Sequence, residues 1–308
     1  MTVFLTIAHW LLVLAMPILL IGVINRVKSW WVGRQGPGLL QSFFDLRRLL
    51  GKKSVVSQTA SPLFRAGAYI VLCCGLLAAS MVPLLGQYAP LSFSHDFIVV
   101  AYTLGLARIA LTVSAMDVGS AFEGMGAARE AAFSTFAEPA LFILIGSVAA
   151  ATGMTSFSGL IGQLHHTPSY GLIVVPVVVA LLILLQAEAA RVPVDDPMTH
   201  LELTMIHEVM ILDHSGPELA AMQYAAALKM TFYAGLIAAL LNPFDPWRSP
   251  GLAVIASGAL MLGVAMLVGC IESLIARLPM RWVPRYLWLA GLAGLGSMLV
   301  VGLGGRGV

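Results

Sequence analysis

Residues 171–190 read GLIVVPVVVALLILLQAEAA, an almost unbroken run of aliphatic side chains. A transmembrane helix needs about 20 such residues to cross the roughly 30 Å hydrocarbon core of a bilayer. The run therefore predicts a membrane-spanning helix, and it carries a carboxylate, Glu188, close to its end.

The rest of the chain repeats this pattern. Of its 308 residues 59% are hydrophobic and 10% are charged, and the mean hydropathy is +0.92, so too few polar residues are present to cover a water-soluble globule. Runs of suitable length lie at about 3–24, 64–85, 97–115, 133–153, 171–190, 228–243, 252–273 and 286–304. They predict an all-α integral membrane protein with about eight transmembrane helices, seven or nine being the alternatives. Residues 1–308 are expected to form a single polytopic membrane domain.

Basic residues set the predicted orientation. The first connection between spans carries seven of them and the third, fifth and seventh carry five more, whereas the second and fourth carry none and the sixth has Arg248. Because loops rich in Lys and Arg stay in the cytoplasm, the odd connections are predicted to be cytoplasmic and both termini outside, in a multi-pass protein of the cytoplasmic (inner) membrane. The near balance of 17 basic and 15 acidic residues predicts no nucleic-acid partner.

The first connection contains a candidate interfacial helix at about residues 39–50. Its apolar residues recur every three or four positions, and the charged residues Asp45, Arg47 and Arg48 lie off that stripe. This pattern predicts an amphipathic helix at the cytoplasmic face of the bilayer. Such a helix either anchors the loop or also shapes a cavity that faces the lipid.

The fifth connection, at about 188–227, is the most polar part of the chain. Its segment EAARVPVDDPMTHLELTMIHEVMILDHSGPE, residues 188–218, holds seven carboxylates and three histidines. Pro193 and Pro197 exclude one continuous helix, although a short helix is expected after Pro197. The histidines recur every seven residues, about 10 Å apart along a helix, which is too far to share one metal ion. Proton transfer or the docking of a partner subunit therefore fits this loop better than a metal site.

The cysteines also argue against a metal or redox centre. The three of them, Cys73, Cys74 and Cys270, lie in apolar runs without the Cys-x-x-Cys spacing of a zinc or iron–sulfur site.

Glu138 is a candidate functional residue, because a carboxylate inside a membrane boundary is costly and by default marks a functional site. Its alternative is a purely structural ion pair with Arg129 or Arg108.

Several short motifs resemble one family when they are taken together and in order. They are Arg34 to Gln41 (RQGPGLLQ) with Asp45, Met116 to Phe122 (MDVGSAF), Gly126 to Glu130 (GAARE), Glu138-Pro139, Glu188 ahead of Val192 to Asp195 (VPVD), Ser215-Gly216, Leu228-Lys229, and Glu272 to Arg277 (ESLIAR). With these motifs the chain resembles the membrane subunit of formate hydrogenlyase and hydrogenase-4, which belong to the group 4 energy-converting nickel–iron hydrogenases. That subunit is homologous to a membrane subunit of NADH-quinone oxidoreductase, in the respiratory complex I subunit 1 family.

The resemblance implies a subunit of an oxidoreductase complex with no redox centre of its own. The NiFe centre and iron–sulfur clusters are then expected on the hydrogenase large and small subunits, which dock on the cytoplasmic side, while antiporter-like subunits adjoin in the lipid bilayer. It also implies a buried proton path, for which the candidates are Asp117, Glu130, Glu138, Glu188, Asp195, Glu202, Lys229 and Glu272. The candidates for docking partner subunits are Arg34, Asp45, Arg47, Arg48, Arg129, Asp213 and His214.

The chain departs from the family between Met198 and Leu212. The family has several closely spaced Glu residues followed by Glu-Tyr-Ser-Gly, whereas here Met198 to Glu202 reads MTHLE and Asp213 to Gly216 reads DHSG. The departure favours the hydrogenase branch, in which no membrane quinone is required. A quinone-site subunit and a purely structural anchor are the alternatives, and whether H⁺ or Na⁺ moves and which electron donor is used stay open.

Overall fold

The computed structural model describes residues 1–167, 170–196 and 205–304, and it confirms the all-α prediction: the described residues form helices and no strand. Eight of the helices are long and apolar enough to span a membrane. They are α1 (Thr2–Trp31), α3 (Pro62–Met81), α4 (Asp96–Asp117), α5 (Ala121–Thr152), α7 (Tyr170–Glu188), α9 (Gly216–Leu241), α10 (Pro250–Leu274) and α11 (Val283–Gly304), the last entered through a 3-10 turn, Met280–Trp282.

Two spanning helices begin well before the predicted spans. Helix α5 begins at Ala121, whereas the predicted span begins at 133, and α9 begins at Gly216, whereas the predicted span begins at 228. Both extensions are polar, so a search for apolar runs does not find them, although the helical backbone continues through them. The polar loop predicted at 188–227 therefore ends at the start of α9.

Three short helices complete the described chain. Helix α2 (Gln41–Leu50) lies within the predicted 39–50, while no sequence pattern predicts α6 (Phe157–Leu164). Ser156 starts α6, because its hydroxyl accepts a hydrogen bond from the Gly159 N–H at 3.2 Å. The short helix expected after Pro197 is α8 (His207–Met210).

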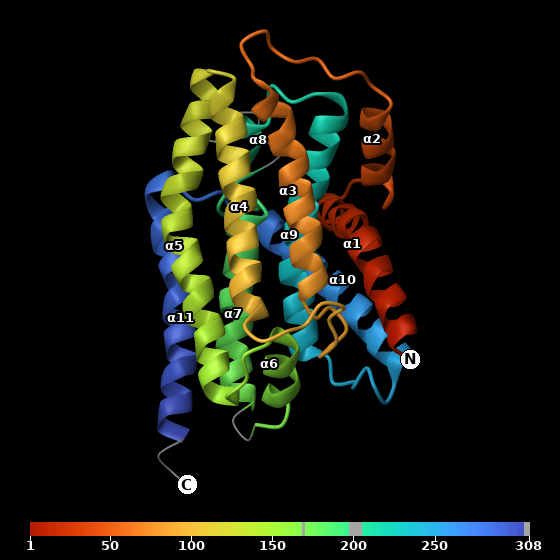
Figure 1. The fold of residues 1–308 in the computed structure, drawn as a ribbon, viewed down its shortest axis with the longest axis vertical. Coiled ribbons are helices and arrows are strands. Elements are labelled where there is room, and N and C mark those ends of the chain that lie inside the picture. The colour runs from red at the N-terminus through yellow and green to blue at the C-terminus, as the bar shows by residue number, and fades with distance from the viewer. Residues whose placement is uncertain (168–169, 197–204, 305–308) are drawn as a thin grey trace.

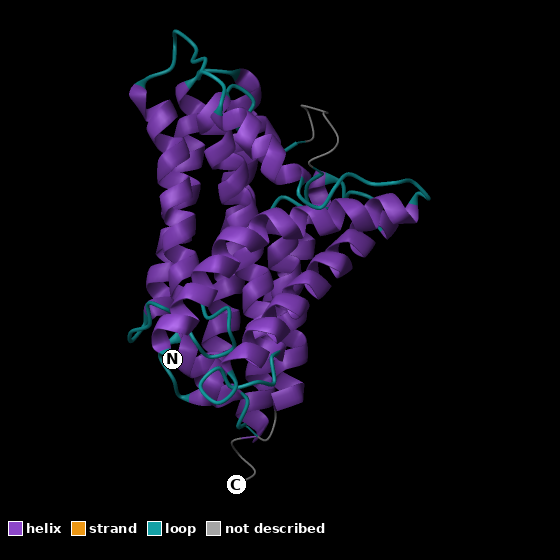
Figure 2. Cartoon of the chain, turned by 90° about the vertical axis from the view of Figure 1, so that its right-hand side faces the viewer, coloured by secondary structure: helices purple, strands orange, loops and turns teal. Residues whose placement is uncertain are grey.

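Helix α9 is the centre of the bundle. It contacts α1, α3, α7 and α10. In its most apolar stretch of 18 residues 83% are buried, against 33–50% in the corresponding stretches of the other spanning helices. Around it α3 packs on α4, α11 on α5 and α7, and α1 on α10 (Figure 1). The helices are not all parallel: one group follows the long axis, and a second is inclined and projects to one side (Figure 2).

The first and fifth connections, which contain α2 and α8, lie at the end of the bundle opposite the start of α1. The start of α1 and the end of α11 lie toward one end, and α2 and α8 lie toward the other (Figure 1). None of the α2 residues is buried, and Leu40, Phe43 and Phe44 are about half exposed, as an interfacial helix requires. That the end with α2 faces the cytoplasm stays a prediction.

The connection after α2 is tied down at two points. Ser215 at the start of α9 bonds both the N–H and the carbonyl of Val55, at 2.7 and 2.8 Å, and the carboxylate of Asp117 accepts the Ser61 N–H at 2.7 Å. Gly216 has a φ of +56°, and a Cβ there would lie 3.1 Å from the carbonyl oxygen of Lys52. A glycine at this position therefore allows the connection to cross the start of α9 closely.

Candidate functional site

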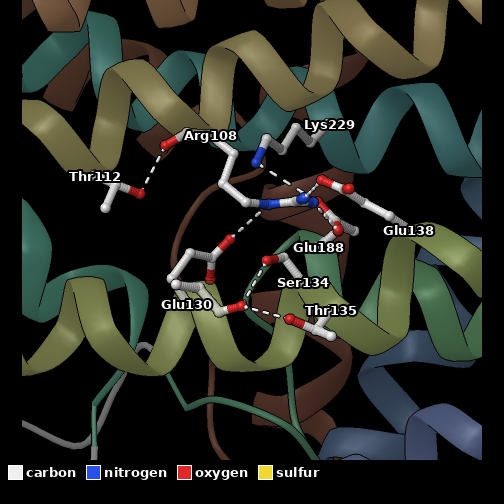
Figure 3. A network of polar contacts seen from close by, with 9 residues as sticks. Arg108, Thr112, Glu130, Ser134, Thr135, Glu138, Glu188 and Lys229 are labelled. Atoms are coloured by element: carbon white, nitrogen blue, oxygen red, sulfur yellow. Dashed lines mark hydrogen bonds and ion pairs between the residues drawn. The ribbon is translucent and has the colours of Figure 1, made fainter.

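An arginine inside the membrane span α4 gathers three carboxylates. The Arg108 Nε lies 3.2 Å from Glu130 Oε1, while its two terminal nitrogens contact Glu138 and Glu188 (Figure 3). Glu130 and Glu138 are eight residues apart on α5, slightly more than two helical turns, so both leave the same face. Glu188 reaches the same guanidinium from the end of α7.

Lys229 joins this group from the central helix α9. Its Nζ lies 3.7 Å from Glu188 Oε2, and only 7–8% of the Lys229, Glu188 and Arg108 side chains is exposed. Two cations therefore face three carboxylates, and with every group ionised one negative charge is in excess. A low-dielectric site favours overall neutrality, which one bound proton supplies. We call Arg108, Glu130, Glu138, Glu188 and Lys229 the Arg108 network.

The network reaches the surface at one point and borders two small cavities. The Glu138 side chain is 51% exposed although it lies within a spanning helix. A cavity of about 60 Å³ lies beside Arg108, Glu138 and the fully buried Tyr233. A second, of about 20 Å³, is lined by Glu130, Glu188, Lys229, Asp195 and His207. The second is large enough for one water molecule.

Asp195 lines that second cavity together with Glu130, Glu188 and Lys229 of the network. Its Oδ2 accepts the backbone N–H groups of Ile206 and His207 at 3.1 and 3.0 Å, and its Oδ1 lies 3.2 Å from Arg277 Nη2. Burial raises the pKa of the Asp195 carboxyl, although these partners oppose the rise. Asp195 thus fixes the start of α8 beside the network. Gly126 on α5 permits the approach, because a Cβ there would lie 2.4 Å from a Val209 methyl group.

Glu272 and Asp117, the other described proton-path candidates, lie outside the Arg108 network. The buried Glu272 carboxylate pairs with Lys28 at 2.9 Å and with Arg191 at 3.6 Å, which links α10 to α1 and to the end of α7. Asp117 holds the connection before α3. Glu202 lies outside the described residues.

The docking candidates divide into exposed and internal side chains. Arg34, Arg47, Arg48 and Asp213 are exposed, and Asp45 is partly so. Arg129 donates to the carbonyl oxygen of Met205 at 2.8 Å. His214 is buried: it contacts the Ser114 hydroxyl at 3.2 Å, and its ring centroid lies 3.9 Å from that of Phe64. Burial lowers the pKa of His214, and its packing argues against the docking role predicted for it.

The sequence does not predict two features of the structure. The sequence presents Arg108 only as a possible partner of Glu138, although it is the centre of the network; an arginine inside a predicted span is the available signal. Glu123 is buried and accepts the Asp213 N–H at 3.1 Å, which holds the loop before α9 against α5. Only the fold brings residues this distant in sequence together.

A larger cavity lies between α1, α2, α8 and α9. Its volume is about 260 Å³, and its wall is apolar except for side chains that include Asn25, Asp45, Arg191 and His207. The described residues contain no group of three His, Cys, Asp or Glu side chains able to hold a metal ion together. The Arg108 network offers acid–base and electrostatic chemistry, and the large cavity can accept a small amphipathic molecule.

Comparison with known proteins gives this geometry a family context. The family model described as NADH dehydrogenase matches residues 3–301, nearly the whole chain. The chain belongs to the NADH dehydrogenase family. Two Escherichia coli K12 proteins are similar along most of their length. Formate hydrogenlyase subunit 4 is 29% identical over 287 residues, covering 90% of this chain and 92% of the relative. Hydrogenase-4 component C is 25% identical, covering 92% and 90%.

Two further proteins are also similar to this chain. A subunit of the NADH-quinone oxidoreductase of Wolbachia pipientis wMel is 26% identical over 189 residues, covering 56% of this chain and 55% of the relative. Among solved structures, a chain of the membrane-bound sulfane sulfur reductase, an archaeal respiratory membrane complex, matches with a TM-score of 0.82 over 96% of this chain and 99% of that chain. At 17% identity that match shows the fold alone.

Proposed function

We propose that this chain is the membrane-anchoring and coupling subunit of a multisubunit nickel–iron hydrogenase or formate hydrogenlyase complex. The hydrogenase large and small subunits dock on the cytoplasmic side and carry the NiFe centre and iron–sulfur clusters, and antiporter-like subunits adjoin in the bilayer. The similarity to formate hydrogenlyase subunit 4 and hydrogenase-4 component C supports this choice of complex. The chain's own part is to link the redox module to proton (or Na⁺) movement.

The observation that carries the proposal is the charge balance of the Arg108 network. Three carboxylates share two cations among four spanning helices, so the network is neutral with one proton bound and negative without it. A charge change in the partner module shifts that balance, because electrostatic interactions are strong where water is scarce. The half-exposed Glu138 offers an outlet toward a neighbouring membrane subunit.

Replacing Glu188 with Gln tests this proposal. The amide still accepts a hydrogen bond from Arg108, so assembly is expected to persist. The amide carries no charge, however, and it holds no exchangeable acidic proton. We expect the rate of charge movement per assembled complex to fall at least about tenfold, since positioned proton-transfer groups contribute roughly a hundredfold or more. The measurement uses membrane vesicles that contain the intact complex, driven by its hydrogenase reaction.

Asp245→Asn is the matched control. Asp245 pairs with Arg248 in the connection between α9 and α10, it is not part of the network, and its side chain is 35% exposed. That variant should keep both yield and charge movement. Unchanged charge movement in Glu188→Gln as well would contradict the coupling function and leave the structural anchor, in which such substitutions alter only the yield of complex.

The 260 Å³ cavity supports a second candidate, a quinone-site subunit of an NADH-quinone oxidoreductase-like complex. Its apolar walls suit a lipid-soluble ring, and Tyr224 and His207 would supply polar contacts. A ligand pocket typically spans about 300–1,000 Å³, so this cavity holds at most a ring with its tail outside. Quinone extracted with the purified complex, or inhibition by quinone-site ligands, would favour this candidate over the first.

A further inference from the structure

His207, in the part of the chain that departs from the family pattern, lies between the large cavity and the Arg108 network. It lines both the 260 Å³ cavity, with α1, α2 and α9, and the 20 Å³ cavity, with Glu130, Glu188 and Lys229. His207 therefore contacts both cavities and is in reach of a molecule in either one.

The surroundings of His207 fix its backbone and leave its ring available. The backbone N–H donates to Asp195 Oδ2 at 3.0 Å, a bond that does not depend on the side chain. The ring Nε2 is buried and has no hydrogen-bond partner among the described residues. A buried polar nitrogen without a partner is costly, and because His207 lines two cavities, a water molecule or ligand in either one is in position to supply that partner after a small shift of the ring.

The ring is uncharged near neutral pH. Burial, and to a smaller degree the positive charge of Lys229, lowers the pKa of His207 to about 4. A neutral imidazole has one N–H donor and one nitrogen acceptor, so it can take a proton on one side and release one from the other. A group with this pKa passes protons on rather than storing them.

We propose that His207 relays protons from the large cavity to the Arg108 network. One proton binds to the bare ring nitrogen from the large cavity, and the proton on the other nitrogen leaves to a carboxylate, Glu188 or Glu130. The ring then holds one proton as before, on the opposite nitrogen, and a ring flip restores the first tautomer. The 20 Å³ cavity has room for the one water that completes the link.

Charged groups surround this relay on both sides. Asp45 of α2, Glu208 of α8 and Arg191 line the large cavity, while Glu130, Glu188 and Lys229 line the small one. The carboxylates at the large cavity attract protons from the cytoplasmic side. Lys229 limits the lifetime of a positive charge on the ring and so favours release to the carboxylates behind it.

The proposal rests on the proposed coupling function, so its test separates the two. The intact complex in membrane vesicles carries His207→Ala, His207→Gln or Glu188→Gln, with the exposed His166→Gln as control. Charge movement per assembled complex is followed with a potential-sensitive dye, with and without added imidazole. Potential is the suitable readout, because imidazole is a permeant weak base that would collapse a pH gradient.

We expect both His207 variants to assemble, because the Asp195 bond is to the backbone, and to lose at least about tenfold in rate. Imidazole should restore the rate in His207→Ala, where truncation leaves room beside the cavity, and have little effect on His207→Gln or the unaltered complex. A structural role for the ring gives no such rescue.

The contrary results are distinct. Full rates in the His207 variants together with a slow Glu188→Gln complex would overturn the relay and leave the coupling function standing. A slow His207→Ala complex that imidazole does not restore would also overturn the relay. Full rates in the His207 variants and in Glu188→Gln would overturn both.

Discussion

Two buried charge clusters in this bundle have opposite stoichiometry. In the Arg108 network two cations face three carboxylates, whereas at Glu272 two cations, Lys28 and Arg191, face one. The first cluster borders small cavities and has one half-exposed carboxylate; the Glu272 side chain is fully buried.

Under the proposed function, the difference distinguishes a proton carrier from a structural link. A cluster with an excess of carboxylate becomes neutral by binding a proton, so its charge can change during turnover. At Glu272 the cations outnumber the carboxylate, so no excess negative charge is left for a proton to balance. Glu188 in the first cluster and Glu272 in the second give the same sequence signal, an acidic residue at the end of a span. Only their neighbours in the fold distinguish them.

Replacing Arg108 with Leu should have the largest effect. It removes the cation that three carboxylates share, and breaking even one buried pair costs about 3–5 kcal/mol. We expect little or no complex to accumulate in the membrane. The yield of assembled complex measures this, and Arg248→Leu is the control, because Arg248 is 89% exposed and its pair contributes about 0–1 kcal/mol. Normal yield of Arg108→Leu would contradict the central place of Arg108.

Replacing Glu272 with Gln should have the next largest effect, and mainly on stability. Lys28 and Arg191 would lose their shared partner, at a cost of about 3 kcal/mol. Lys28→Met should cost less than about 1 kcal/mol, because Lys28 is 25% exposed and Arg191 remains as the partner of Glu272. Thermal unfolding of the purified complexes compares the two variants. Charge movement per intact complex should be unchanged in both; if it fell in Glu272→Gln, Glu272 would belong to the proton path.

Replacing Glu138 with Gln should reverse that result. Arg108 keeps two other carboxylates and the network loses its excess negative charge, so we expect a smaller loss of stability than in Glu272→Gln. Charge movement should fall about tenfold, because the outlet carries no acidic proton. Unfolding temperature and vesicle potential, measured on the same preparation, check both parts. A large loss of stability with normal charge movement would make Glu138 structural.

The sequence predicts the spans better than the site. Apolar length alone locates α7, but it misses the early starts of α5 and α9, because polar residues such as Glu130 and Glu218 continue those helices. The resemblance names Glu130, Glu138, Glu188 and Lys229 among its proton-path candidates, and the structure places these four in one cluster with Arg108. That they carry protons stays a prediction. The arginine that joins them lies 22 to 80 residues from its partners, and the separate place of Glu272 depends on helix packing that no local pattern encodes.

The smallest expected effect is the response of stability to pH in the loop beside the Arg108 network. The pKa of His207 is about 4 in the folded chain against an ordinary value of 6.5, so below pH 6.5 the unfolded chain binds a proton that the folded chain does not. Stability from this group is therefore complete above pH 6.5 and declines as the pH falls toward 4. We expect the unfolding temperature of the purified complex to fall between pH 7 and pH 5, and His207→Gln to reduce that fall by about 2–4 °C. His214, whose pKa burial also lowers, should keep part of the acid sensitivity in the variant. An equal fall in His207→Gln and the unaltered complex would mean that the ring beside the network is already solvated, and the contrast with the closed Glu272 site would then rest on charge stoichiometry alone.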